Sequence, residues 1–229
     1  KYIMSLLFTN EWFTFKNAIS KKDCNRIKNL GRGKSKNLAV NYNAPSIDEW
    51  IESGVHSNSP LTKEERLTGQ KPDYEKNIKA RISENYFTTE QWLYDLIWPY
   101  MLEANKVSGW NLDIHAAEDM QLGRYRKGGF YNWHRDGSSD SLSAYDKPEN
   151  SFMHGKVRKL TLSLILNDDF EGGEFEFCCY DRGECKITPI ELKRGDMIFF
   201  TSGMEHRVTP VTKGVRYSLV NWFVGQPVR

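Results

Sequence analysis

The stretch Arg158-Lys-Leu-Thr-Leu-Ser-Leu-Ile-Leu-Asn167 decides the fold class of this chain. Its leucines occupy every second position, and Thr, Ser and Ile stand between them. Because side chains of an extended strand point alternately to its two faces, this pattern predicts a strand with one leucine face. The same period of two continues at Phe175 and Phe177, directly after Gly172-Gly173.

Further short strands are expected on both sides of this stretch. Turn sequences such as Lys193-Arg194-Gly195-Asp196 and Thr212-Lys213-Gly214 separate them. Many short strands parted by turns favour an antiparallel sandwich or barrel with the earlier helices packed outside. The additional strands are predicted at 112–115, 119–126, 186–192, 196–201 and 215–224.

Two helices are predicted before residue 110. Ser20-Lys-Lys-Asp23 is a weak capping box that precedes Cys24, Ile27 and Leu30, and Gly31 marks the end of this helix. Thr88-Thr89-Glu90-Gln91 offers a second capping box, and Pro99 predicts a kink or a break into two pieces. We expect the apolar face of the second helix to pack on the sheet. That face consists of Trp92, Leu93, Leu96, Ile97, Tyr100 and Met101.

Two polar segments interrupt these elements. Residues 32–77 are rich in Gly, Pro, Ser and Asn, which predicts a long loop with a short helix near Asp48–Ser53. Residues 137–156 form a Ser- and Asp-rich insertion. Each segment is a candidate either for a substrate lid or for surface decoration. We expect one domain over 1–229, with a helical support region in 1–109 and the β core in 110–229.

Composition excludes several classes of protein. Lys and Arg number 32 against 30 Asp and Glu, so the formal net charge is +2, which argues against a nucleic-acid or anionic-membrane binder. No apolar run approaches the roughly 20 residues that span a bilayer, and the first residues are too short for a secretory signal. A cytoplasmic location is therefore expected. The start at Lys1 suggests that the natural N-terminus has been trimmed.

The four cysteines predict reduced thiols. They are Cys24, Cys178, Cys179 and Cys185. Adjacent Cys178 and Cys179 cannot readily bridge each other, and the chain contains no CxxC pair. A disulfide or a zinc site is the disfavoured alternative.

His134-Arg135-Asp136 is the first element of a candidate metal site. Residues i and i+2 of an extended segment point to the same face, so His134 and Asp136 can share one ion. A third candidate, His206, follows a hydrophobic strand and the turn Thr201-Ser202-Gly203. Two histidines and one carboxylate form the facial triad of non-haem Fe(II) oxygenases, which leaves positions open for a chelating keto-acid and dioxygen. His56, His115 and His154 are not expected to be ligands.

Arg216 is the candidate partner for the far carboxylate of such a keto-acid. A buried carboxylate needs a cation, and a planar guanidinium can pair with it in bidentate fashion. Strand parity places Arg216, Ser218, Val220 and Trp222 on one face, with Tyr217, Leu219, Asn221 and Phe223 on the other. The Ser218 hydroxyl is expected to assist.

Four segments of the sequence resemble the Fe(II)/2-oxoglutarate dioxygenases, and in particular their prolyl 4-hydroxylase-like branch with the PKHD-type hydroxylases. The resemblance covers 110–229 well and the preceding helices more loosely. It implies a double-stranded β-helix (jelly-roll) core with the N-terminal helices packed on one sheet. The segments are 122–137 (LGRYRKGGFYNWHRDG), 158–167, 170–175 (FEGGEF) and 206–222 (HRVTPVTKGVRYSLVNW).

The resemblance also implies a role for each site residue. His134, Asp136 and His206 become the catalytic iron ligands, and Arg216 becomes the partner of the 2-oxoglutarate C5 carboxylate. Tyr125 adds a second hydrogen bond to that carboxylate. Trp222 and Arg135 are expected near the substrate. Tyr125 and Trp222 also fit the alternative of buried aromatic residues that only fill the core.

The implied activity is hydroxylation of a substrate C–H bond, with succinate and CO2 as co-products. Fe(II), 2-oxoglutarate and O2 are the expected cofactor and co-substrates, and ascorbate is a further candidate. A prolyl residue in a peptide or protein is the substrate that the resemblance favours. The alternatives are an oxygenase acting on a free amino acid or small metabolite, a nucleic-acid demethylase, and a jelly-roll binding protein without activity.

Overall fold

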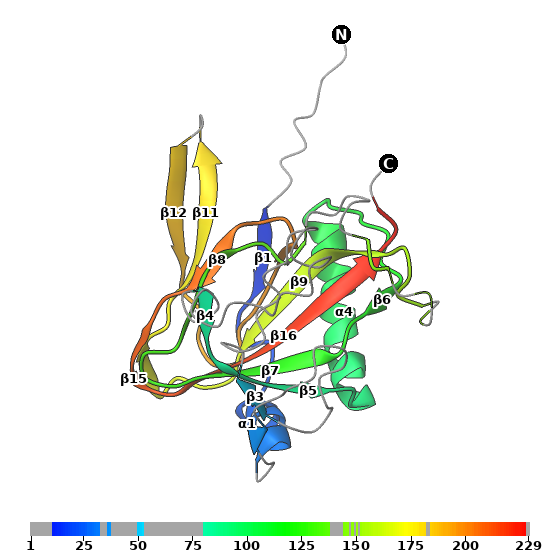
Figure 1. Ribbon diagram of the computed structural model, residues 1–229. Coiled ribbons are helices and arrows are strands. Elements are labelled where there is room, and N and C mark those ends of the chain that lie inside the picture. Colours follow the sequence, from blue (N-terminus) through cyan, green and yellow to red (C-terminus); the bar gives the residue numbers. More distant parts are fainter. Residues whose placement is uncertain are drawn as a thin grey trace, which may run out of the picture.

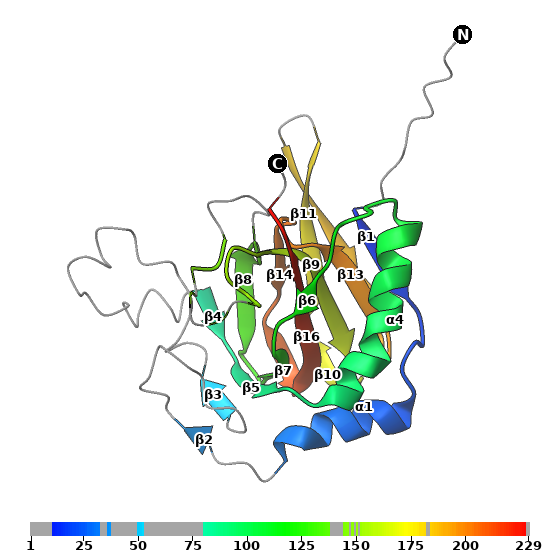
Figure 2. The same cartoon turned by 90° about the vertical axis from the view of Figure 1, so that its right-hand side faces the viewer.

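The computed structural model describes residues 11–32, 36–37, 50–52, 80–137, 144–146, 148, 150, 152–181 and 184–227. Two mainly antiparallel sheets face each other, and two helices cover the outer face of the larger sheet (Figures 1 and 2). The helices are α1 (Lys21–Lys28), continued by the short 3-10 helix η1 (Asn29–Gly31), and α4 (Gln91–Val107).

The larger sheet has nine described strands and the smaller sheet has five. In order, the larger sheet contains β1 (Trp12–Phe15), β13 (Met197–Thr201), β9 (Val157–Ile165), β16 (Arg216–Gly225), β7 (Met120–Tyr125), β5 (Glu84–Thr88), β3 (Trp50–Glu52) and β2 (Lys36–Asn37), with β6 (Ala116–Ala117) beside β16. The smaller contains β12 (Glu184–Ile190), β11 (Phe175–Asp181), β14 (His206–Val208), β8 (Phe130–His134) and β4 (Arg81–Ile82). A separate pair joins β10 (Phe170–Gly172) to β15 (Val211–Gly214).

Core strands alternate between the two sheets along the chain, except that the consecutive strands β11 and β12 form a hairpin within the smaller sheet. β7, β9, β13 and β16 belong to the larger sheet, whereas β8, β11, β12 and β14 belong to the smaller one. This alternation winds the chain into a double-stranded β-helix, so the prediction of a mainly β jelly roll with flanking helices is confirmed.

The leucine face of β9 packs toward the helices and not toward the second sheet. Leu160, Leu162 and Leu164 are fully buried in one cluster with residues of α1 and α4. A second cluster, which includes Phe175, Phe177 and Phe200, fills the space between the two sheets. The chain therefore has two apolar layers on opposite sides of the larger sheet.

Both predicted helices form, but only one of the two predicted N-terminal caps is present. The Ser20 cap is confirmed, since its Oγ accepts a hydrogen bond from the Asp23 backbone N at 3.1 Å. The prediction of a capping box at 88–91 is wrong. Thr88 belongs to β5, and Glu90, the N-cap residue of α4, makes no side-chain hydrogen bond that caps the helix. The predicted packing of the α4 apolar face on the sheet is confirmed, with Leu93, Ile97, Met101 and Ala104 buried.

α4 runs without interruption through Pro99, so of the two predicted alternatives the break does not occur, and the kink stays a prediction. A proline inside a helix costs about 3 kcal/mol or more. Burial of Leu93, Ile97 and Met101 contributes about 1.5–3 kcal/mol for each side chain. Packing on the sheet therefore outweighs the lost backbone hydrogen bond.

Two further local predictions are wrong. Where a short helix was expected near Asp48–Ser53, the described residues form strand β3, which pairs with Glu84–Tyr86 of β5. The expected strand at 112–115 is irregular, and the strand in this region is β6. The Asn105 side chain accepts from the Leu112 backbone N at 2.9 Å and donates to the Leu112 carbonyl at 2.8 Å. These are the backbone groups that would otherwise pair with a neighbouring strand. Most of the predicted loop 32–77 lies outside the described residues.

The prediction of four reduced cysteines is also wrong. Cys178 and Cys185 form a disulfide across the β11–β12 hairpin, which projects beyond the rest of the smaller sheet (Figure 1). The hairpin register places Cys178 diagonally opposite Cys185, with their Cα atoms 5.6 Å apart. Cys24 and Cys179 are free.

No helix in the described part of the chain has the length and apolar character needed to cross a bilayer.

Leu162→Ala tests the apolar layer beneath the helices. The substitution leaves a cavity between β9 and the helices, so we expect the free energy of unfolding to fall by about 2–5 kcal/mol. Leu102→Ala makes the same chemical change on the outer side of α4, where Leu102 is 53% exposed, and should cost less than about 1 kcal/mol. Urea unfolding measures both, and equal losses would contradict the placement of this layer.

Candidate metal centre

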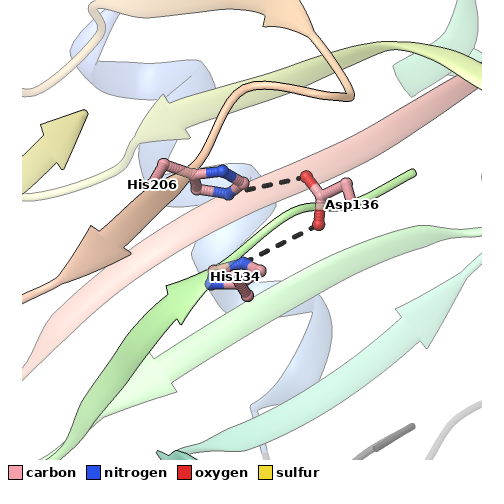
Figure 3. Close-up of side chains that lie close together, drawn as sticks. All are labelled: His134, Asp136 and His206. Carbon is pink, nitrogen blue, oxygen red and sulfur yellow. Dashed lines mark ion pairs between the residues drawn. The ribbon is translucent and has the colours of Figure 1, made fainter. Parts of the chain in front are cut away.

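His134, Asp136 and His206 converge on one point (Figure 3). Their ligand atoms all lie within 4.8 Å of one another. Nε2 of His134 is 3.7 Å from Asp136 Oδ1, and Nε2 of His206 is 3.6 Å from Asp136 Oδ2. In the part of the chain that the structure describes, no other group of three His, Cys, Asp or Glu side chains meets in this way.

Strand pairing brings the three residues together. His134 ends β8 and His206 begins β14, and the register of these two antiparallel strands places the two histidines opposite each other. Asp136 follows β8 by two residues. Its backbone N and that of Gly137 both donate to the Ser202 carbonyl, each at 3.0 Å. These two bonds fix the backbone at the residue whose carboxylate points toward the two histidines.

Hydrogen bonds orient the side chains as ligands. Nδ1 of His134 bonds the Asn132 carbonyl at 2.7 Å, and Nδ1 of His206 bonds the Met204 carbonyl at 2.9 Å. Because a carbonyl only accepts, each Nδ1 carries the hydrogen, and a neutral ring keeps its lone pair on Nε2. Thr161 Oγ1 donates to Asp136 Oδ2 at 2.9 Å and holds the carboxylate.

The surroundings favour the charge states that a metal requires. Burial, followed by the nearby His206, lowers the pKa of His134 to about 3, so this imidazole is neutral near pH 7. Burial opposes ionisation of Asp136, but His206, His134, Arg158 and the Thr161 hydroxyl together lower the pKa of Asp136. The site therefore offers a carboxylate together with a neutral imidazole.

Aromatic rings pack around both imidazoles. Tyr131 stacks on His134 with ring centroids 3.4 Å apart and planes 12° apart. Phe200 and Phe175 lie 4.7 and 5.5 Å from the ring of His206. These contacts restrict the rotation of both rings.

Arg216 is a buried cation without an acidic partner among the described residues. Its side chain lies in β16 opposite Tyr125 of β7 and is 1% exposed. Nη1 bonds Ser218 Oγ at 3.1 Å, Nε has no partner, and burial lowers the pKa of the guanidinium. Gly173 leaves room for this side chain, since a Cβ there would lie 2.9 Å from Arg216 Cδ. An unpaired buried cation is costly, so this position favours binding of an anion.

The two residues predicted near a substrate occupy different surroundings. Trp222 is buried, its Nε1 has no partner, and the Arg158 guanidinium lies over its ring at 4.0 Å. The Arg135 side chain is exposed and lies 3.6 Å from Glu205. The role of each next to a substrate stays a prediction.

Sequence reasoning missed Thr161 and the half-buried pair Arg158–Glu118. Arg158 Nε and Nη2 donate to the two carboxylate oxygens of Glu118 at 2.6 and 2.7 Å. Strand parity could have revealed Thr161, since it lies on the face of β9 opposite the leucines. Of the other histidines, His115 pairs with Asp113 at 2.8 Å, His154 is exposed, and His56 lies outside the described residues.

Known sequences resemble the part of the chain that contains this cluster. A family model described as the 2OG-Fe(II) oxygenase superfamily matches residues 120–224. A PKHD-type hydroxylase of Acidovorax ebreus is 31% identical over 105 residues, which are 44% of this chain and 41% of that protein. Human prolyl 3-hydroxylase 2 is 44% identical over 73 residues, 31% of this chain and 10% of that protein. The chain thus spans less than half of the length of each of these curated relatives.

Comparisons with solved structures show the same fold. The 2OG complex of viral collagen prolyl hydroxylase from Paramecium Bursaria Chlorella virus-1 superposes with a TM-score of 0.59 at 19% identity, covering 96% of this chain and 99% of that one. A prolyl-4-hydroxylase from Pseudomonas putida gives a TM-score of 0.57 at 17% identity, covering 95% and 94%. Residues 120–224 are therefore similar in sequence to the 2OG-Fe(II) oxygenase superfamily, and the chain resembles the PKHD-type hydroxylases in sequence and shares the fold of the prolyl hydroxylases.

Proposed function

We propose that this protein is an Fe(II)- and 2-oxoglutarate-dependent dioxygenase that hydroxylates a prolyl residue in a peptide or protein. One combination of features carries the proposal. A cluster of two histidines and one aspartate lies in the same β-helix as Arg216, a buried guanidinium with no acidic partner among the described residues. A metal alone would not account for that cation, whereas a metal together with a dicarboxylate keto-acid accounts for both.

The donor set fits Fe(II). Two imidazole nitrogens and one carboxylate are the ligands of the non-haem iron oxygenases. Nε2 of His134, Nε2 of His206 and the Asp136 carboxylate would hold the metal, while Thr161 keeps the carboxylate oriented. When bound, Fe(II) with 2-oxoglutarate and O2 supplies the oxidation that breaks an unactivated C–H bond, with succinate and CO2 as co-products.

Arg216 and its neighbours would hold the C5 carboxylate of 2-oxoglutarate. A guanidinium can form two parallel hydrogen bonds to a carboxylate, and the buried surroundings strengthen the pairing. Ser218 Oγ already contacts Arg216, and Tyr125 lies opposite Arg216 across the sheet. The apolar cluster between the sheets, to which Phe175 belongs, keeps water away from this end of the site.

The relatives support the choice of a prolyl substrate. Human prolyl 3-hydroxylase 2 is among the sequence matches, and a prolyl hydroxylase of Trichoplax adhaerens that shares the fold was solved with a hypoxia inducible factor peptide fragment. A free amino acid or small metabolite is the alternative substrate. A binding protein without activity is disfavoured because all four key polar residues are present. Ascorbate use and a cytoplasmic location stay predictions.

We also propose that residues 1–229 act as one domain. Strands β1 and β5 and helices α1 and α4, all from the first half of the chain, pack in or on the same sheet as β9 and β16. The first half thus supports the sheet that carries Arg216.

His134→Ala and Asp136→Ala should each abolish iron-dependent succinate formation, because each removes one of three ligands. His115→Ala is the matched control, since His115 also pairs with an aspartate but lies outside the cluster, and it should keep its turnover. The assay measures succinate release with Fe(II), 2-oxoglutarate and proline-containing peptides, with free amino acids in parallel. Unchanged turnover in either ligand variant would rule out the assignment.

Arg216→Gln should mainly weaken the binding of 2-oxoglutarate. Loss of a charged, buried hydrogen-bonding partner costs about 2–3 kcal/mol, so the KM for 2-oxoglutarate should rise about 30- to 150-fold. The Kd for Mn(II), used as an inert substitute for Fe(II), should stay within about twofold because Arg216 contacts none of the three ligands. If the KM were unchanged, Arg216 would not be the carboxylate partner.

His134 should make the metal-free protein sensitive to acid. Its pKa is about 3 in the folded protein, against 6.5 ordinarily, so the unfolded chain binds the proton first as the pH falls. Stability is then lost between about pH 6.5 and 3, and about 2 kcal/mol of it between pH 7 and 5.

Urea unfolding at pH 7 and pH 5 measures this loss, which should shrink in His134→Gln. Asp136 does not mask the effect, because its ordinary pKa of 3.8 is lowered further in the folded protein, so Asp136 titrates below the measured interval from pH 7 to 5. An equal loss in the wild type and the variant would show that His134 is not buried as a neutral group.

A further inference from the structure

The insertion that follows Asp136 returns to the site through an ordered stem. Tyr145 N donates to the Lys156 carbonyl at 2.9 Å, and Gly155 N donates to the Tyr145 carbonyl at 2.9 Å. Met153, which lies between them in sequence, packs in a small cluster with Ala116 of β6 and Val224 of β16. Tyr145 is therefore held against the larger sheet and does not lie in a free surface loop.

The Tyr145 hydroxyl points at the half-buried pair Arg158–Glu118. It donates to Glu118 Oε1 at 2.6 Å, the oxygen that also accepts from Arg158 Nε at 2.6 Å. Burial raises the pKa of Tyr145, so the hydroxyl keeps its hydrogen and remains a donor. Hydrogen bonds to a charged acceptor in such surroundings are stronger than those between neutral groups.

Arg158 in turn touches two candidate site residues. Its Nη1 donates to the Asp136 carbonyl at 3.2 Å, and its guanidinium lies over the Trp222 ring at 4.0 Å. A short chain of contacts thus runs from the insertion to the backbone of a metal-ligand candidate. Since bidentate pairing fixes the plane of a guanidinium, the position of Glu118 decides where Arg158 meets Asp136 and Trp222.

We propose that Tyr145 is a positioning residue for the metal centre. It holds Glu118 and, through Glu118, Arg158, so that the stem of the insertion sets the positions of Asp136 and Trp222. The inference rests on the proposed function only in taking Asp136 as a metal ligand. Because binding equilibria are reciprocal, a stem that improves metal binding must itself be stabilised when the metal binds.

Tyr145→Phe removes the hydroxyl and keeps the ring. Partners that orient a metal ligand typically contribute 10- to 100-fold to metal affinity, and Tyr145 acts one step further away. We expect the Kd for Co(II) to rise about 3- to 10-fold, measured by titration of the full chain without oxygen. Glu118→Gln, which keeps the shape of the acceptor, should weaken Co(II) binding in the same direction.

Tyr100→Phe is the matched control. Its hydroxyl also makes one half-buried hydrogen bond, to the Ala18 carbonyl at 3.0 Å, but it lies on α4 away from the three ligand candidates. It should lower the melting temperature about as much as Tyr145→Phe and leave the Kd for Co(II) within about twofold. A purely structural role for Tyr145 would give the same result in both variants.

Hydrogen exchange gives a second readout. Co(II) should slow exchange at the Tyr145 and Gly155 amides in the wild type, and this protection should be absent in Tyr145→Phe. If the wild type does not bind Co(II) at the triad, the proposed function fails. If the wild type binds and Tyr145→Phe binds equally well with the same protection, the positioning role is overturned and the proposed function stands.

Discussion

His206 lies opposite His134 because β14 pairs with β8 in antiparallel register. If the pairing register shifted by one residue, one imidazole would point to the other face of the sheet, and the three side chains would no longer meet. The carboxylate depends on the same neighbourhood, since Ser202, four residues before His206, anchors the backbone of Asp136 and Gly137. The β8–β14 pairing therefore sets the positions of the two histidines, whereas Ser202 and Thr161 of β9 set the position of Asp136.

A half-buried arginine, Arg158, and a fully buried one, Arg216, differ in how their charge is paired. Arg158 is paired with Glu118 through two hydrogen bonds, whereas Arg216, only 1% exposed, is in contact with a serine hydroxyl and a tyrosine ring. Arg216 is withdrawn from water completely and Arg158 in part, so both incur a desolvation cost, which is larger for Arg216. The chain supplies its own carboxylate in one case and none among the described residues in the other. That contrast is the strongest physical reason to assign an external carboxylate to Arg216.

Strand parity and spacing predicted the features that depend on short stretches of chain. The face shared by His134 and Asp136, the face shared by Arg216 and Ser218, and the leucine face of β9 all follow from a period of two. Contacts between distant segments could not be predicted in this way. Glu118 stands 40 residues before Arg158, and the register that joins Cys178 to Cys185 exists only once the hairpin has formed. At Pro99 packing outweighs the local signal for a break, and α4 continues as one helix.

The position of the insertion is compatible with an intact metal centre. The chain is fixed just before the insertion, where the Asp136 and Gly137 amides bond Ser202, and again just after it, where Arg158 of β9 bonds the Asp136 carbonyl. Ser202 and Arg158 thus hold the backbone of Asp136 directly, and the insertion acts on Asp136 only through Tyr145, Glu118 and Arg158. Length and composition between these two points can therefore vary without moving Asp136, as long as Tyr145 or an equivalent donor still reaches Glu118. An insertion at this point is a place where evolution can alter what surrounds the site while leaving the ligands unchanged.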